Sequence, residues 1–133
     1  MKIAITANAA NLEADIDPRF GRCQYLLIVD PEKMEFEALD NSGAMAGGGA
    51  GIATAQMIAG TGVDAVLTGN CGPNAYQVLE AAGIKVVTGV SGKVQDAIQN
   101  YKSGKLKASS QPNVAEHFGM GRGMGRGRGI GRR

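Results

Sequence analysis

The segment that decides the fold is Val63–Gly83, VDAVLTGNCGPNAYQVLEAAG. It begins with a short apolar, β-branched run, Val63–Thr68, which is typical of a buried strand. It continues into Pro73–Ala82, where apolar residues recur at the spacing i, i+3, i+4, i+7 of a helix that covers a core. Pro73 suits the first helical position, and Gly83 suits the left-handed residue that follows a helix. The segment therefore predicts a strand, a loop and a helix.

A second apolar run, Ile84–Thr88, follows at once and completes a strand–helix–strand unit with parallel strands. The loop GNCG (residues 69–72) places a thiol at the carboxyl end of the first strand. Ligands bind at this edge of open α/β sheets because the N–H groups of helices converge there. Since the helix dipole favours a thiolate, we expect the pKa of Cys71 to lie below its ordinary value of about 8.5. The alternative is a small cysteine that simply fills the core.

The rest of the chain predicts three more strands and two more helices. Met34–Asp40 should pair with the preceding strand as an antiparallel hairpin and form a half-buried edge, with Phe36 on its inner face. Ser91 should cap the last helix. We therefore predict an α/β fold with a mixed five-stranded sheet and helices on its faces. The further strands expected are Lys2–Ala7, Gln24–Asp30 and Met34–Asp40, and the further helices are Ala50–Ala59 and Gly92–Tyr101.

Charge and composition divide the chain into a body and a tail. Residues 1–116 hold nine Lys/Arg against twelve Asp/Glu, a balance of −3, whereas residues 117–133 hold five Arg and no acid. Glycine occupies every second position from 119 to 131, so ordering this segment costs backbone entropy with little apolar surface to offset it. We expect one domain over residues 1–106 and a disordered tail over residues 107–133.

The two cysteines form no CxxC pair and no disulfide framework, so we expect reduced thiols in the cytoplasm. No apolar run approaches 18 residues, and we expect neither a membrane span nor a signal peptide.

Further candidate site residues precede the second strand, in the segment DPRFGRC (residues 17–23). If this strand lies antiparallel beside the first, Cys23 comes to the same sheet edge as Cys71, and Arg19 and Arg22 supply cations there. Exposure to solvent is the plain alternative for each arginine, and core packing is the alternative for Cys23.

The glycine-rich run of residues 47–51 opens a helix, so the amides of Gly47, Gly48 and Gly49 can form an anion nest. A flexible connection is the alternative. The run is not a nucleotide-binding loop, because it lacks the GxxxxGK[ST] pattern. The one histidine, His117, has no apparent catalytic partner, so we expect no enzymatic activity.

These segments resemble the dinitrogenase iron–molybdenum cofactor biosynthesis family. The likeness rests on DPRFGR (17–22), the glycine run, GNCGPNA (69–75) and GIKV (83–86), in that order, and extends over about residues 1–106. It implies a ribonuclease H-like fold, helices on both faces of a sheet of order 3-2-1-4-5, and no nuclease activity. It also implies a small protein that binds or carries metal–sulfur clusters, either of the iron–molybdenum type or a molybdenum–copper sulfide.

Two function classes follow. In the first, the protein is a cluster carrier or scaffold, a monomer or weak dimer that serves cluster donor and acceptor proteins. In the second, the Gly-Arg tail binds nucleic acid or an acidic partner through salt-sensitive contacts. For the first class, the candidate cofactor-binding residues are Arg19, Arg22, Gly47, Gly48, Gly49, Asn70, Gly72 and Asn74, and the candidate metal ligands are Cys71 and Cys23.

Overall fold

Five strands form one mixed sheet in the computed structural model of the chain, which describes residues 1–41 and 50–109. The sheet has the order β3-β2-β1-β4-β5, which confirms the predicted order 3-2-1-4-5. The central strand β1 pairs antiparallel with β2 and parallel with β4, and the hairpin of β2 and β3 is also confirmed. The ribonuclease H-like classification stays a prediction. The strands are β1 Ile3–Ala7, β2 Tyr25–Asp30, β3 Glu35–Asp40, β4 Ala65–Leu67 and β5 Lys85–Val87.

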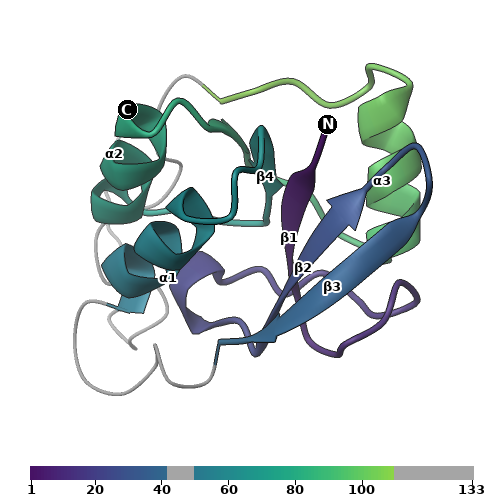
Figure 1. The fold of residues 1–133 in the computed structure, drawn as a ribbon, viewed down its shortest axis with the longest axis horizontal. Coiled ribbons are helices and arrows are strands. Elements are labelled where there is room, and N and C mark those ends of the chain that lie inside the picture. The colour runs from purple at the N-terminus through teal and green to yellow at the C-terminus, as the bar shows by residue number, and fades with distance from the viewer. Residues whose placement is uncertain (42–49, 110–133) are drawn as a thin grey trace, which may run out of the picture.

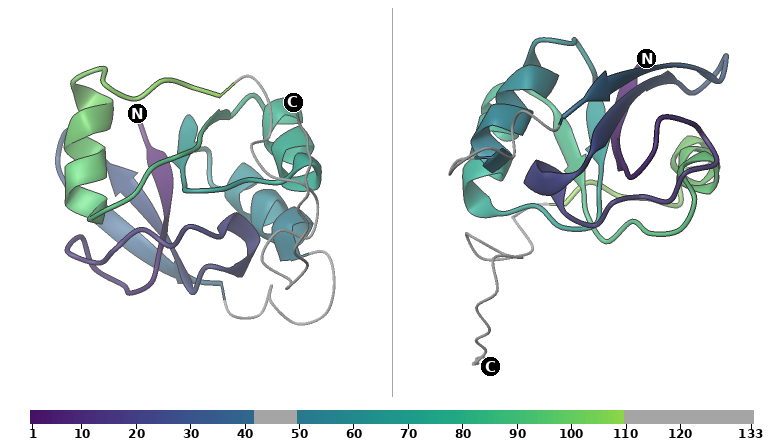
Figure 2. Two further views of the ribbon diagram at one scale, coloured as in Figure 1. Left: turned by 180° about the vertical axis from the view of Figure 1, so that it is seen from behind. Right: turned by 90° about the horizontal axis from the view of Figure 1, so that it is seen from below.

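Helices cover both faces of this sheet (Figures 1 and 2). α1 (Ala50–Ala59) and α2 (Pro73–Ala81) lie on one face, and α3 (Val94–Lys102) lies on the other. The three helices begin and end close to the predicted positions. Gly83 follows α2 with φ +76°, the left-handed conformation expected there.

The core consists of two layers because successive strand residues point to opposite faces. Toward α1 and α2, the sheet contributes Leu26 and Val66, which pack with Ile58 and Leu79. Toward α3, it contributes Ile5, Leu27 and Leu67, which pack with Val94 and Ile98. Since β2 is covered on both faces, its apolar run YLLIV is continuous rather than alternating.

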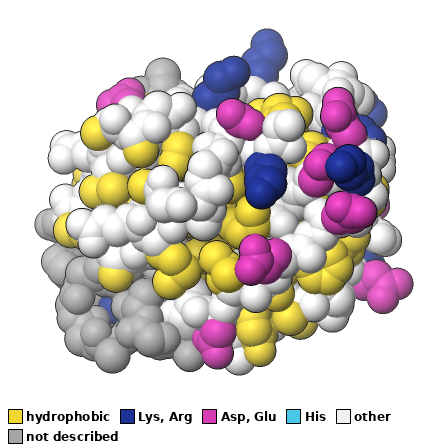
Figure 3. All heavy atoms as spheres, viewed as in Figure 1, with side chains coloured by type: hydrophobic (Ala, Val, Ile, Leu, Met, Phe, Trp, Pro, Cys, Tyr) yellow, Lys and Arg dark blue, Asp and Glu magenta, His cyan; other side chains and the backbone are white. Residues whose placement is uncertain are grey.

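Two local predictions were wrong. Ser91 does not cap α3, whose N-cap is Lys93 without a side-chain hydrogen bond, because Gly92 at φ +89° turns the chain before the helix begins. Phe36 is 41% exposed rather than half-buried, because β3 is the outer strand of the sheet and pairs only with β2 among the described strands. The acidic side chains of β3 itself are exposed, and Figure 3 shows acidic and apolar groups together over this part of the surface.

The sheet pairing brings several loops to one edge. Ala7 at the end of β1 lies opposite Tyr25 at the start of β2, and Tyr25 lies opposite Asp40 at the end of β3. β4 runs parallel to β1 and ends at the same edge. The segment 8–24, residue 41 and the loop 68–72 therefore meet at the carboxyl edge of β1 and β4, as predicted.

In the part of the chain that the structure describes, no helix has both the length and the apolar character that a membrane crossing requires.

Candidate functional site

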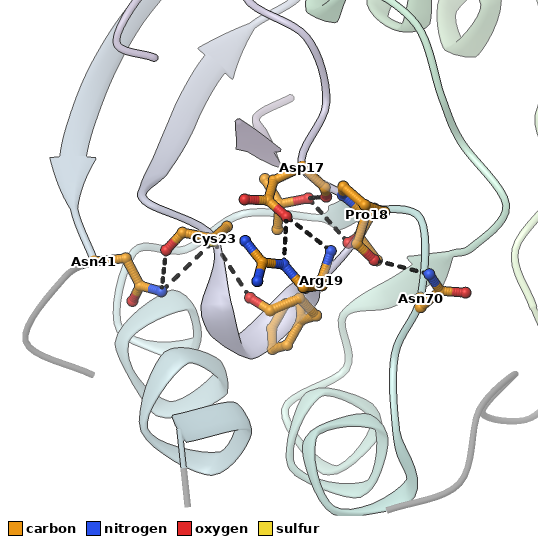
Figure 4. Close-up of polar contacts among 9 residues, drawn as sticks. Asp17, Pro18, Arg19, Cys23, Asn41 and Asn70 are labelled. Carbon is orange, nitrogen blue, oxygen red and sulfur yellow. Dashed lines mark hydrogen bonds and ion pairs between the residues drawn. The ribbon is translucent and has the colours of Figure 1, made fainter. Parts of the chain in front are cut away.

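The two motif loops at the carboxyl edge are joined directly (Figure 4). Arg19 and Asn70 form a parallel β-bridge, in which the backbone N–H of Phe20 donates to the Asn70 carbonyl at 3.2 Å. The Asn70 side-chain amide donates to the Pro18 carbonyl at 3.0 Å. The structure thus brings DPRFGRC and GNCG together, which their sequence separation alone does not show.

Gly69 is the point of closest approach between these loops. A Cβ atom built on Gly69 lies 2.7 Å from the Pro18 Cα atom, a distance that side chains do not tolerate. The first glycine of GNCG is therefore required by contact with the other motif rather than by its own backbone angles.

Asp17 organises the turn that presents the arginines. Its carboxylate accepts the Arg19 backbone N–H at 2.9 Å and forms an ion pair with the Arg19 Nε atom at 3.4 Å. Thr6 donates its hydroxyl to the Asp17 carbonyl at 2.8 Å, which anchors the turn to β1. Asp17 is buried, while the Arg19 side chain is 50% exposed.

Arg22 ends a short 3-10 helix, Phe20–Arg22, and is half-buried. Among the described residues it makes no ion pair. The segment thus presents two guanidinium groups at the site, and one of them has no carboxylate partner within the described residues.

Cys23 lies in a buried polar network. Its thiol donates to the Phe20 carbonyl at 3.3 Å, and the Asn41 amide donates to the Cys23 carbonyl at 3.0 Å and approaches the sulfur at 3.5 Å (Figure 4). Thr54 of α1 donates to the Asn41 Oδ1 atom at 3.1 Å. The network joins the end of β3 to α1 beneath the site.

The expected low pKa of Cys71 was wrong. Cys71 is fully buried in the layer between the sheet and the helices α1 and α2, and its thiol approaches the Gly72 carbonyl at 3.7 Å. Burial raises the pKa of Cys71 to about 12, because removal from water disfavours the charged thiolate. Burial and then the Asp17 carboxylate raise the pKa of Cys23 to about 12 as well.

The remaining predicted residues lie around these loops or outside the described part. Gly72 is the N-cap residue of α2 and is half-buried, and Asn74 is exposed in its first turn. Gly47, Gly48 and Gly49 lie outside the described residues, as does the tail from residue 110. Sequence reasoning missed Asp17, Asn41 and Thr54. Their polar character within or beside apolar segments was the signal that could have identified them.

Within residues 1–41 and 50–109, no three His, Cys, Asp or Glu side chains are placed to hold a metal ion together. Both cysteines are buried as neutral thiols. The guanidinium groups of Arg19 and Arg22 and the side-chain amide of Asn70 are groups of the kind that bind anions in proteins.

A family model described as dinitrogenase iron-molybdenum cofactor matches residues 1–104. The apo form of the orange protein from Desulfovibrio gigas is 39% identical, with a TM-score of 0.82 over 85% of this chain and 96% of that one. A putative NifB protein from Thermotoga is 34% identical, with a TM-score of 0.69 over 80% and 91% of the two chains. An uncharacterized protein of Methanocaldococcus jannaschii is 34% identical over 80% of this chain and 90% of its own length.

Proposed function

We propose that this chain, which belongs to the dinitrogenase iron–molybdenum cofactor family, binds an anionic metal–sulfur cluster as cargo at the carboxyl edge of its sheet. The observation that carries the proposal is the joining of DPRFGRC to GNCG, which sets Arg19 beside Asn70, two residues before the N-cap Gly72 of α2. Arg22 ends the 3-10 helix that directly follows Arg19. On this proposal the protein is a cytoplasmic carrier or scaffold rather than an enzyme, and it receives the cluster from a donor protein and passes it to an acceptor.

Charge supplies the first recognition step. A thiometallate anion carries its negative charge on sulfur atoms, and guanidinium groups meet such a surface with several N–H donors each. A unit charge pair 4 Å apart near a protein surface is worth about 4 kcal/mol before desolvation. Arg19 keeps part of this capacity, because only its Nε atom is engaged by Asp17. Asn70, Gly72 and Asn74, and the amides of Gly47, Gly48 and Gly49, are proposed to complete the cradle.

The thiols of Cys71 and Cys23 are proposed to act in a second step. Both must first become accessible and lose a proton, which the positive charge of the metal favours. A cluster therefore meets the arginines first and is anchored by sulfur afterwards.

The test is titration of the full chain with tetrathiomolybdate, with and without iron or copper, followed by visible absorption. Arg19→Ala combined with Arg22→Ala is expected to weaken binding about tenfold or more at low ionic strength, and the loss should shrink as salt screens the charges. The matched control is Lys33→Ala combined with Lys85→Ala, which removes two exposed cations from the opposite edge of the sheet and should leave binding unchanged.

Cys71→Ser separates the two steps. It is expected to leave the initial salt-dependent binding nearly unchanged and to speed cluster loss, because serine is a poor ligand for soft metals. If the arginine double variant and the lysine double variant bind tetrathiomolybdate with the same affinity, the proposed recognition by charge at this edge is wrong. If the unaltered chain binds no thiometallate at all, the proposed function is wrong.

A further inference from the structure

The two outer strands of the sheet differ in what lies beside them. At β5, the backbone N–H of Ser109 donates to the Val86 carbonyl at 2.7 Å, and the Thr88 backbone N–H donates to the Ser109 Oγ atom at 3.3 Å. At the other side, β3 pairs only with β2 among the described strands, and Figure 1 shows it at the outside of the sheet. An outer strand of six residues presents backbone N–H and C=O groups with which a further strand can pair.

The side chains of β3 differ between its two faces. Glu37 lies opposite Ile28, which belongs to the core layer on the side of α1 and α2, and Glu35 shares this face. Phe36 lies opposite Val29, which belongs to the layer on the side of α3. Both carboxylates are exposed, and the Phe36 side chain is 41% exposed. The strand therefore offers negative charge on one face and an aromatic ring on the other.

The charge of this hairpin argues against a second copy of the chain as its neighbour. Residues 30–40 hold five Asp/Glu against one Lys, and β3 itself has neither the Lys nor the Pro that often protects an outer strand. Two β3 strands placed side by side would bring like charges together across the pair, which destabilises the pairing. A basic segment meets the same carboxylates with opposite charge.

We propose that β3 is a docking edge for a basic extended segment of another protein, which pairs with β3 as a further strand of the sheet. Because side chains of a strand alternate between its faces, the segment places Lys or Arg beside Glu35 and Glu37 and apolar side chains beside Phe36. The end of β3 lies at the carboxyl edge, opposite the start of β2, so a protein docked here stands near the proposed cluster site. The inference goes beyond cluster binding and does not depend on it.

The experiment titrates the ¹⁵N-labelled full chain, without metal, with a blocked eight-residue peptide in which Lys and Val alternate. The amide signals of β3 are expected to shift, while those of β5 stay unshifted. The control peptide has four Lys followed by four Val, so it keeps the composition and charge but cannot place Lys on one face and Val on the other. It should bind at least tenfold more weakly. Equal affinity of the two peptides would show attraction by charge alone and would overturn the proposed strand pairing.

Charge reversal tests the role of the carboxylates. Glu35→Lys combined with Glu37→Lys should weaken binding of the Lys-Val peptide at least tenfold. An alternating Glu-Val peptide should then shift the β3 amides of this variant but not those of the unaltered chain, and this exchange also shows that the variant is folded. The matched control, Glu80→Lys combined with Asp96→Lys, changes the net charge equally at exposed helix positions and should bind the Lys-Val peptide normally. Equal losses in the two double variants would overturn the docking edge.

Other occupants of β3 give different results in the same titration. If the Lys-Val peptide never shifts the β3 amides of the full chain, this edge is not open to a partner, and the proposal is wrong. If the β3 amides shift with protein concentration alone, a second copy occupies the edge, and the choice of a basic partner is wrong. No thiometallate is present, so neither result bears on the proposed cluster binding.

Discussion

Gly69 shows how a single residue couples the two motifs. Because its missing side chain would meet the backbone of Pro18, Gly69→Ala is expected to separate the loops and to lower the free energy of unfolding by about 1–3 kcal/mol. The control is Gly60→Ala, where the nearest atom to the added Cβ is the Met57 carbonyl oxygen at an ordinary 3.6 Å, so stability should hold or rise slightly. Urea denaturation measures both. Equal stability of the two variants would show that the close approach carries no constraint.

The buried thiols predict a dependence of stability on alkaline pH. The pKa of Cys71 is raised to about 12 in the folded protein by burial, so the unfolded chain loses this proton first as pH rises. The contribution of the thiol is complete below pH 9 and declines toward pH 12, at about 1.4 kcal/mol per pH unit.

Urea denaturation of the unaltered chain and of Cys71→Ala between pH 8 and pH 11 tests this expectation. The variant should be less stable at neutral pH because of the cavity, but its stability should fall less steeply above pH 9. Parallel pH profiles would mean that Cys71 is accessible to solvent in the folded state.

The position of Cys71 could be predicted from the sequence, whereas the ionisation of its thiol could not. The position follows from local signals, because a strand ends at Leu67 and a helix begins at Pro73. The pKa depends on burial, which comes from packing against α1, and a helix 12 or more residues away cannot be placed by local periodicity. Because the buried thiols are neutral while the arginines at this edge are charged, we expect an anionic cluster to be recognised by charge before a thiol binds its metal.

Among the elements, α1 depends on a side chain outside it. Asn41 follows β3, is fully buried and bonds both the Cys23 carbonyl and the Thr54 hydroxyl. Asn41→Ala leaves these groups unpaired and is expected to cost about 1–3 kcal/mol, with faster amide hydrogen exchange in α1. Asn100→Ala, on the exposed side of α3, is the matched control and should change stability little. Unchanged exchange in α1 would indicate that water replaces the Asn41 amide.

The elements themselves were predicted well where apolar periodicity was strong. α2 and α3 present the expected core residues, such as Leu79 and Ile98, because a helical stripe faces the sheet in any such fold. Phe36 was misplaced because alternation in β3 does not reveal whether a helix covers that edge. Ser91 was misplaced because a serine near a helix start is a cap only if the chain enters the helix at that residue.

For the whole molecule, topology explains why a site could be expected at all. The antiparallel pairing of β1 with β2 and the parallel pairing of β1 with β4 carry DPRFGRC and GNCG to one edge. The order of the strands could be predicted from family resemblance, whereas the hydrogen bonds between Pro18, Phe20 and Asn70 required coordinates.

The folded body extends to Ser109, beyond the expected end of the domain. The family match stops at residue 104, and our expected domain boundary was residue 106, yet Ser109 bonds to Val86, Thr88 and Tyr76 and lies along the outer edge of β5. A chain ending at Ser109 should therefore unfold at the same urea concentration as the full chain. A chain ending at residue 104 loses these hydrogen bonds and the partly buried Leu106, and should be less stable by about 2–4 kcal/mol.

The shorter chain also exposes the edge of β5, and an unpaired edge promotes pairing between molecules. Size-exclusion chromatography over a range of concentrations should detect this association for the chain ending at residue 104 and not for the chain ending at Ser109. If the two chains match in stability and in size, the contacts of Ser109 with Thr88 and Tyr76 contribute nothing to the folded body, which then ends before Ser109.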